Sequence, residues 1–250
     1  INYSNIILSK FANIILSYFT TIQIPPFIPR YKIKRVFTAT DTNQFRPLPK
    51  NEKILKSIGS STNDFICIYI GGMFSWHGLD TMIEAAHICK NKSKNNIKFL
   101  LVGKGEMYGF IKNLIKEYQL ENYVKMIGRV PFNDVVKYLG CADVALSLNT
   151  QDSIGFKLLE YMAAGLPIIT TNADVVDLLI QNKEEGLIVD LNNPKDTYDK
   201  IIQLYENPDL VKRFGQKVRN KVVEKYTWDA HYKNIRSAIL EFIKRKTSKN

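Results

Sequence analysis

Short apolar runs alternate with longer amphipathic segments through the middle of the chain. Some runs are apolar enough to form strands buried on both faces: residues 65–71, 97–103, 123–127, 143–148, 167–171 and 187–190. Between them lie segments in which apolar side chains recur every three or four positions, the helical spacing: residues 79–90, 107–118, 133–139 and 156–164. Buried strands with intervening helices predict an α/β fold with a Rossmann-like, doubly wound parallel sheet.

The two ends of the chain have a different pattern. Residues 1–35 contain a proline-rich break followed by a basic connector. Residues 193–246 have a helical pattern that is interrupted at Pro208 and near Trp228. The first residue is Ile1 rather than Met, so we expect the chain to be a fragment of a longer protein.

The composition is that of a globular protein with an excess of positive charge. Of 250 residues, 45% are hydrophobic and 24% charged, and 35 Lys and Arg against 24 Asp and Glu give a net charge of +11. This charge favours anionic partners, which include nucleotides, acidic membrane surfaces and nucleic acid. No apolar run reaches the roughly 18 residues of a membrane span. Cys67, Cys89 and Cys141 form no CxxC pair and only three histidines are present, which argues against a disulfide framework or zinc site and indicates a reducing cytoplasm.

Glycine-containing loops follow the first three predicted strands, at the sheet edge where such folds bind ligands. After the first strand, Gly72 permits close approach of the backbone to a ligand, and His77 is placed to donate a hydrogen bond to phosphate. The alternative is a glycine turn with a surface imidazole. Gly103 lies in a tight turn before a helix N-terminus, which favours anions. After the third strand, Arg129 precedes Val130 and either reaches an anion or lies in solvent.

The most informative segment follows the fourth strand and begins the next helix. Asp152 precedes Gly155, and Glu160 follows one helical turn later. Gly155 leaves backbone N–H groups free at a helix N-terminus, which suits a diphosphate, and Lys157 adds a full positive charge beside them. The Glu160 carboxylate offers two oxygens to two adjacent ribose hydroxyls, and Asp152 would face whatever the diphosphate carries. An acidic residue before a solvated helix face is the alternative, and spacing alone leaves both open.

The run from Asp152 through Gly155 to Glu160, continuing to residue 169, resembles the E-x7-E element of retaining family 4 glycosyltransferases, which have the GT-B fold. Other motifs of that family occur in the same order from Val36 to the C-terminus. The matching segments are residues 36–47, 71–78, 101–105, 127–131, 142–144, 186–189 and 226–228. This unbroken order carries more weight than any single motif.

The resemblance implies an enzyme that transfers a sugar from a nucleotide-diphosphate sugar with retention of anomeric configuration. The family's chemistry proceeds by front-face attack and requires no metal, other cofactor or covalent nucleophile. By match, the catalytic positions are Glu160, at the ribose hydroxyls, and Asp152, at the donor sugar. The match implies further substrate-binding positions at Gly72, His77, Gly103, Arg129, Val130, Ile154, Gly155, Phe156 and Lys157. Of these, residues 155–157 would lie at the diphosphate, and Gly103 with residues 129–130 would line the base.

The same resemblance divides the chain into three parts. Residues 1–35 correspond to a remnant of the N-terminal acceptor domain and the interdomain linker, and residues 36–227 to the nucleotide-sugar-binding domain. Residues 228–250 correspond to a helix that crosses back to the N-terminal domain. Because catalysis in this fold occurs between two domains, we expect this chain to bind donor weakly and to show little or no turnover. We also expect the apolar face of the last helix to be partly uncovered, at Ile235, Ile239, Phe242 and Ile243.

Three positions depart from the family pattern. Asp152 stands where the family usually has Glu, so its carboxylate is one methylene shorter. Gly72 takes the place of the usual Arg, and His77 the place of the usual Lys, so two fixed cations are missing. Lys157 is the candidate replacement, together with Arg129. This predicts that Lys157→Ala weakens donor binding more than His77→Ala at pH 8.

Two other functions compete with this interpretation. A nucleotide-sugar epimerase of the GT-B fold would share the sheet but lack the Asp152-to-Glu160 spacing. A nucleic-acid-binding protein would account for the charge of +11. However, the basic residues are spread over 30–56, 90–125 and 212–225 without interleaved aromatic residues, so we expect no specific nucleic acid partner. A plain dinucleotide-binding domain is disfavoured because no GxGxxG follows the first strand.

The implied partners are a nucleotide sugar donor and an acceptor that the sequence does not identify. A lipid-linked glycan from lipopolysaccharide or another cell-surface pathway is the usual acceptor context of such relatives. The basic excess would hold a cytoplasmic enzyme peripherally at the inner face of an anionic membrane, or it would serve solubility alone, and charge leaves both open.

Overall fold

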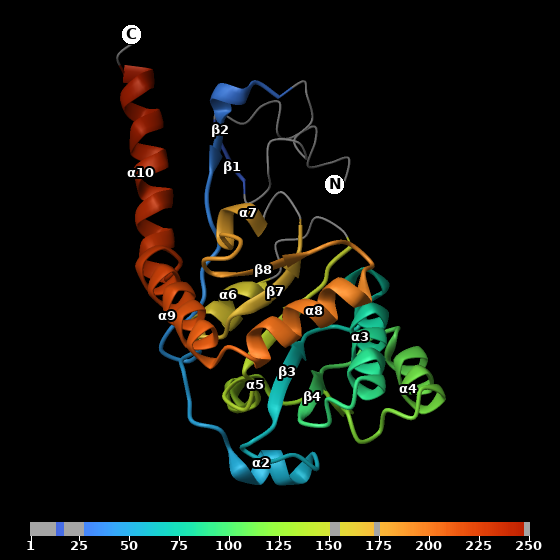
Figure 1. Ribbon diagram of the computed structural model, residues 1–250. Coiled ribbons are helices and arrows are strands. Elements are labelled where there is room, and N and C mark those ends of the chain that lie inside the picture. The colour runs from blue at the N-terminus through green and yellow to red at the C-terminus, as the bar shows by residue number, and fades with distance from the viewer. Residues whose placement is uncertain (1–13, 18–27, 151–155, 173–175, 248–250) are drawn as a thin grey trace.

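The computed structural model describes residues 14–17, 28–150, 156–172 and 176–247, and its centre is a six-stranded sheet of order β5-β4-β3-β6-β7-β8 (Figure 1). Neighbouring strands are parallel throughout this sheet. Each strand is one of the predicted apolar runs, and the doubly wound parallel sheet is confirmed. The strands are β3 (Phe65–Ile70), β4 (Ile97–Val102), β5 (Val124–Gly128), β6 (Val144–Ser147), β7 (Ile168–Thr171) and β8 (Gly186–Val189).

Helices connect successive strands and cover both faces of the sheet. The connecting helices are α3 (Leu79–Asn91), α4 (Tyr108–Glu117), α5 (Phe132–Leu139), α6 (Phe156–Ala163) and α7 (Val176–Leu179). The chain then continues through α8 (Pro194–Tyr205), α9 (Pro208–Lys225) and α10 (Trp228–Thr247), so the two predicted interruptions are confirmed. Helix α2 (Glu52–Ser57), which precedes β3, was not expected from the sequence.

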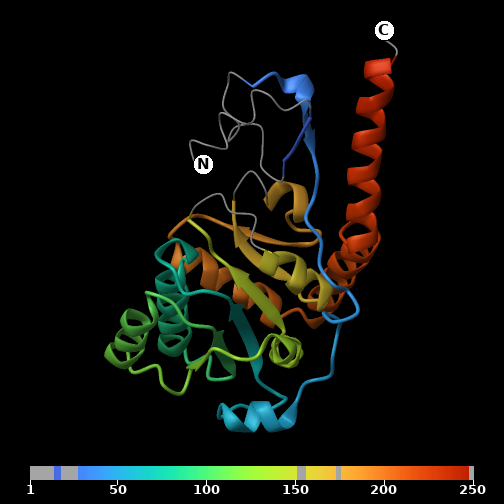
Figure 2. The same cartoon turned by 180° about the vertical axis from the view of Figure 1, so that it is seen from behind.

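The side chains of β3 show why its sequence is apolar without interruption. Ile66, Ile68 and Ile70 belong to a cluster with α5, α6 and part of α9, whereas Cys67 and Tyr69 belong to a second cluster with α3, α4 and α8. Figures 1 and 2 show these helices on opposite faces of the sheet. Because successive side chains of a strand alternate in direction, a strand covered on both sides needs an apolar residue at every position.

The strand order reverses between β3 and β6. From β3 the chain builds β4 and β5 on one side, and from β6 it builds β7 and β8 on the other. Cys67 and Ile68 of β3 pair with Val144 and Ala145 of β6. In open parallel sheets the loops at the carboxyl ends of two such strands diverge and leave a crevice that binds ligands.

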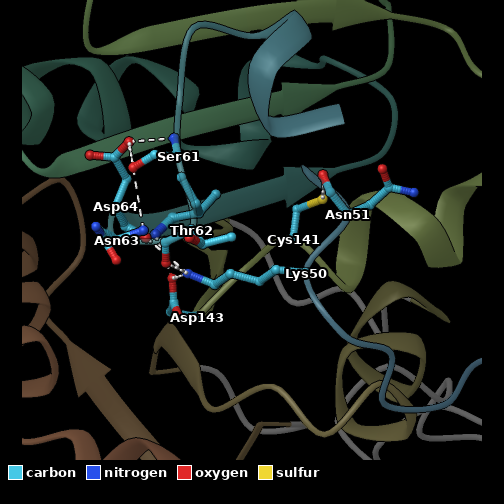
Figure 3. Close-up of polar contacts among 9 residues, drawn as sticks. Lys50, Asn51, Ser61, Thr62, Asn63, Asp64, Cys141 and Asp143 are labelled. Atoms are coloured by element: carbon cyan, nitrogen blue, oxygen red, sulfur yellow. Dashed lines mark hydrogen bonds and ion pairs between the residues drawn. The ribbon is translucent and has the colours of Figure 1, made fainter. Parts of the chain in front are cut away.

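The amino ends of β3 and β6 are joined by a polar network around Asp143 (Figure 3). One Asp143 carboxylate oxygen accepts from Lys50 Nζ and from the Ile66 amide, each at 2.8 Å, and the Asp143 amide donates to Ile66 O at 2.9 Å. Lys50 also donates to Asp64 O at 2.9 Å, which ties the incoming segment to the turn before β3. This network fixes the two strands that define the crevice, at the end opposite to it.

A second, smaller sheet and the last helix lie beyond the main sheet. Strands β1 (Ile15–Ser17) and β2 (Ile33–Arg35) are parallel, with a short 3-10 helix, η2 (Arg30–Lys32), before β2. Helix α10 runs beside them in both views (Figures 1 and 2), and Lys34 Nζ lies 2.7 Å from Glu241 Oε2. Ile239 and Ile243 are 40% and 49% exposed, so the expectation of a partly uncovered apolar face is confirmed there; Ile235 and Phe242 are half-buried. Within the described ranges, no helix combines the length and apolar character that crossing a bilayer requires.

Candidate functional site

The loops after β3 and β6 pack directly against each other. Gly78 has φ +61°, and a Cβ there would lie 2.1 Å from the Leu148 carbonyl oxygen. The Thr150 amide donates to the Trp76 carbonyl at 2.9 Å. These contacts unite the two strand ends on either side of the reversal into one structure at the carboxyl edge of the sheet.

A second close approach joins the loops after β3 and β4. Gly103 has φ +138°, and a Cβ there would lie 1.9 Å from the Gly71 carbonyl oxygen. The Gly103 amide donates to Gly128 O at 2.8 Å, which connects this turn to the end of β5. The structure therefore places Gly103 beside Gly71 and Gly72, and only glycine fits this approach.

His77, in the 3-10 helix η3 (Ser75–His77), faces the start of its own loop. Its Nδ1 lies 2.6 Å from the Gly72 carbonyl oxygen and 2.7 Å from the Tyr69 hydroxyl. A carbonyl oxygen only accepts, so Nδ1 carries the proton. Burial and then the nearby charge of Lys157 lower the pKa of His77 to about 4, despite the opposing hydrogen bond to Gly72. The ring is therefore neutral at pH 7.

Lys157 projects from the first turn of α6 into the same region. Its Nζ lies 3.2 Å from Asn149 Oδ1 and 4.6 Å from the centre of the Tyr69 ring. Burial lowers the pKa of Lys157 to about 7. The Lys157 ammonium therefore gives up its proton near neutral pH, whereas the sequence predicted a full positive charge. Among the described residues, a neutral amide and an aromatic face lie against the ammonium.

Glu160 follows Lys157 by three residues, so the two lie on neighbouring positions of the α6 surface. The Glu160 side chain is half-buried, and burial raises the pKa of its carboxyl group. Within the described part of the chain, no hydrogen bond or ion pair to this carboxylate occurs. Its oxygens are therefore available to accept from a ligand.

Three of the candidate residues, Asp152, Ile154 and Gly155, lie outside the described residues, and their expected roles stay predictions. Phe156 is the first residue of α6, directly before Lys157. The structure thus brings Gly72, His77, Gly103 and the start of α6 to one edge of the sheet.

The aromatic residues of the β3 loop explain how Gly72 can replace a cationic residue. A Cβ at Gly72 would lie 2.4 Å from the Phe74 ring. Phe74 in turn stacks on Trp76, with ring centres 4.8 Å apart and planes 4° from parallel. A longer side chain at position 72 would have to displace this stacked pair, so the loop is built around glycine.

Arg129 and Val130 follow β5, at the outer end of the strand order. Arg129 is exposed to solvent, and Val130 is partly buried against the apolar cluster that contains α5 and α6. The predicted role of Arg129 at an anion or at the base stays a prediction.

Sequence reasoning did not identify Tyr69 and Asn149 as parts of the site. Tyr69 is fully buried and bridges His77 and Lys157, and Asn149 is 7% exposed and held through its carbonyl by the Thr171 hydroxyl at 2.5 Å. The sequence did contain a signal for both residues: each has a side chain that ends in a polar group and lies near the carboxyl end of a largely apolar strand. The described residues hold no group of three or more His, Cys, Asp or Glu placed to bind a metal.

Comparisons with known proteins agree with this architecture. A family model described as Glycosyl transferases group 1 matches residues 50–221. The N-acetyl-alpha-D-glucosaminyl L-malate synthase of Bacillus anthracis is 27% identical over 193 residues, which make up 77% of this chain and 47% of that protein. The chain spans about half the length of the curated relatives it matches.

Two solved structures show the fold. HepE of Anabaena, crystallised with UDP and glucose, has a TM-score of 0.83 at 16% identity, and the match covers 96% of this chain and 68% of that chain. The C-terminal domain of the Francisella tularensis group 1 family protein LpcC has a TM-score of 0.67 at 22% identity, covering 76% of this chain and 99% of that chain. The parallel α/β sheet with Rossmann-like helices is that of GT-B glycosyltransferases.

Proposed function

Because the chain belongs to the glycosyl transferases group 1 family, we propose that it forms the donor-binding half of a retaining glycosyltransferase of family 4. The observation that carries this proposal is the start of α6 at the strand reversal, where Lys157 lies against Gly71 and Tyr69 of the β3 end, and Glu160 follows it by three positions. A cation, and a carboxylate that has no hydrogen-bond or ion-pair partner among the described residues, suit the diphosphate and the ribose hydroxyls of a nucleotide. The family match favours neither the epimerase nor the nucleic-acid-binding alternative.

The candidate residues have separate roles in this proposal. Glu160 accepts from the two ribose hydroxyls, and Lys157 stabilises the diphosphate together with the backbone of residues 155–156. Gly72 and His77, in the β3 loop, lie along the opposite side of the diphosphate. The resemblance alone supports the remaining assignments: Asp152 at the donor sugar, Ile154 as a further substrate-binding position, and Gly103, Arg129 and Val130 around the base.

The proposed reaction retains configuration by front-face substitution. The bond from the anomeric carbon to the diphosphate oxygen breaks, and the acceptor oxygen bonds to the same face of that carbon. The acceptor proton passes to the leaving diphosphate oxygen. Charge that develops on the diphosphate is stabilised by Lys157, which is most effective where burial lowers the local dielectric.

Calorimetric titration of the 250-residue chain with UDP, GDP and ADP, and then with their sugars, tests the donor site. We expect one base to bind, and Glu160→Gln to weaken it roughly 10-fold to 100-fold, the range for hydrogen bonds to a charged group. Glu117→Gln, on the exposed end of α4, is the matched control. Absence of binding to every nucleotide, or equal effects of the two substitutions, would count against the proposal.

The family and the net charge support a proposal for the acceptor and the location of the enzyme. We propose a cell-surface glycan precursor as acceptor, lipid-linked, and a cytoplasmic enzyme that is held peripherally at the inner face of the membrane by its net charge of +11. Sedimentation with anionic vesicles, compared with neutral vesicles, tests the membrane contact.

A further inference from the structure

Tyr69 is the residue on which the polar groups of the β3 loop and α6 converge. It is the fifth residue of β3 and is fully buried, yet its hydroxyl reaches the carboxyl edge of the sheet. The hydroxyl donates to Gly72 O at 2.5 Å and lies 2.7 Å from His77 Nδ1. The ring carries the Lys157 ammonium at 4.6 Å from its centre.

These contacts define one protonation state of His77. The Gly72 carbonyl accepts from both the Tyr69 hydroxyl and the protonated Nδ1. Nε2 is then the ring atom that remains for a ligand, and the His77 imidazole makes no further hydrogen bond in the described part of the chain. Nε2 of such a ring accepts while neutral and donates once an arriving anion has drawn a proton onto it.

The same ring positions the second candidate cation. An ammonium over the face of an aromatic ring is attracted by the ring quadrupole, and this attraction is larger where water is excluded. The ammonium also donates to Asn149 Oδ1, 3.2 Å from Lys157 Nζ, which further restricts its position. Among the described residues, the groups in contact with the Lys157 ammonium are neutral, so that part of the chain supplies no ion-pair partner that would compete with an anion.

We propose that Tyr69 is the positioning residue of the diphosphate site: its hydroxyl fixes His77 with Nε2 available, and its ring places Lys157 beside it. This inference rests on the proposed function, because it assumes that the anion is the diphosphate of a nucleotide. Tyr69 itself remains in the core and touches neither donor nor acceptor.

Charged groups from several elements face this site and contribute to its pH dependence. Lys157 and Glu160 come from α6, and Tyr69 comes from β3. Glu106, in the loop after β4, accepts from the Ser75 amide at 3.1 Å and so lies near the η3 turn. Burial lowers the pKa of His77 and of Lys157 and raises the pKa of Glu160 and of Tyr69, so His77, Lys157 and Glu160 all bear on the pH dependence of the site.

The test compares Tyr69→Phe with Tyr161→Phe. Phe at position 69 removes the hydroxyl and keeps the ring beneath Lys157. Tyr161 is the matched control, since it too is fully buried and its hydroxyl bonds to the backbone of Ile70, at 2.8 Å from the amide, without contacting His77. Nitrogen NMR of the histidine side chains reports the tautomer and titration of His77 in the unliganded chain, and calorimetry reports binding of UDP and inorganic pyrophosphate from pH 5.5 to 8.5.

We expect Tyr69→Phe to release His77 from the Nδ1-protonated tautomer that the hydroxyl helps to fix, and to weaken pyrophosphate binding roughly threefold to tenfold, as loss of a neutral hydrogen bond does. Tyr161→Phe should leave both unchanged. An unaltered His77 tautomer in Tyr69→Phe, or equal changes in both variants, would overturn the positioning role. If pyrophosphate binds and responds as expected but UDP, GDP and ADP do not bind, the proposed function fails while this inference stands. If neither pyrophosphate nor any nucleotide binds, both fail.

Discussion

The α-carbon of Gly78 packs against the Leu148 carbonyl group, and a Cβ at position 78 would lie 2.1 Å from its oxygen. Gly78 also has φ +61°, a left-handed conformation that costs a residue with a side chain about 1 kcal/mol or more. Since Leu148 cannot move without disturbing Asn149 beside it, we expect Gly78→Ala to lower the free energy of unfolding by about 2–4 kcal/mol. Urea titration measures this loss.

Gly109→Ala is the control for that substitution. Gly109 lies in α4, and a Cβ there meets nothing within 4 Å. Alanine in a helix is favoured over glycine by about 0.5–1 kcal/mol, so this variant should be slightly more stable than the wild type. If Gly78→Ala is equally well tolerated, the contact between the two loops does not constrain the crevice.

Arg219 should stabilise the packing of the segment around Thr42 and Phe45, which leads into the main domain. It donates from Nη1 to Phe45 O at 2.9 Å and Ala163 O at 2.7 Å, and from Nη2 to Thr42 O at 3.0 Å. Lysine has no planar fork and cannot reach all these carbonyl groups. We expect Arg219→Lys to cost about 1–3 kcal/mol in urea unfolding, because buried acceptors lose their donors.

Arg213→Lys, an exposed position on the same helix, is the comparison for Arg219→Lys. A loss of stability that is no greater at position 219 than at position 213 would show that this side chain does not hold the entering segment.

The sheet was predictable from the sequence, whereas the charge state of the site was not. Strand β3 is recognisable in the sequence because its side chains, Phe65–Ile70, face two helical layers and are therefore apolar without interruption. Helix α2 was missed because it has only six residues and little apolar periodicity, and its start depends on the Asn51 side chain accepting from the Ile54 amide. The near-neutral pKa of Lys157 arises from burial among groups that only the fold brings together, so spacing could not reveal it.

The buried Lys157 ammonium should lower the free energy of unfolding. Its pKa in the folded chain, about 7, lies below the ordinary value of 10.5, so between these values the unfolded state binds more protons. The destabilisation is complete below pH 7 and disappears as the pH rises through about 10.5. We therefore expect Lys157→Met to raise the free energy of unfolding at pH 7 by on the order of 3 kcal/mol.

The stabilisation by Lys157→Met should also flatten the pH dependence of unfolding between pH 7 and 10, measured by urea titration at each pH. Lys112→Met, on the exposed face of α4, should change neither quantity. Equal stability of Lys157→Met and the wild type at pH 7 would show that the ammonium is well solvated in the folded chain.

Lys157→Ala should weaken UDP binding more than His77→Ala at pH 8. Charging Lys157 there requires a shift of only one pH unit, about 1.4 kcal/mol, because its pKa is about 7. His77, with a pKa of about 4, would need a shift of four units and contributes little charge. Calorimetric dissociation constants compare the two variants, and an equal or larger effect of His77→Ala would contradict this assignment.

Binding of UDP should take up a proton, because the diphosphate raises the pKa of Lys157 from its unliganded value of about 7. At pH 8 most unliganded molecules lack that proton, so the larger part of one proton should be absorbed per UDP bound. Affinity should correspondingly fall as the pH rises above 7. Titrations at pH 8 in buffers of different ionisation enthalpy measure the uptake directly. Lys157→Arg keeps a permanent cation and should bind UDP with almost no uptake, and an uptake equal to that of the wild type would assign the proton to another group.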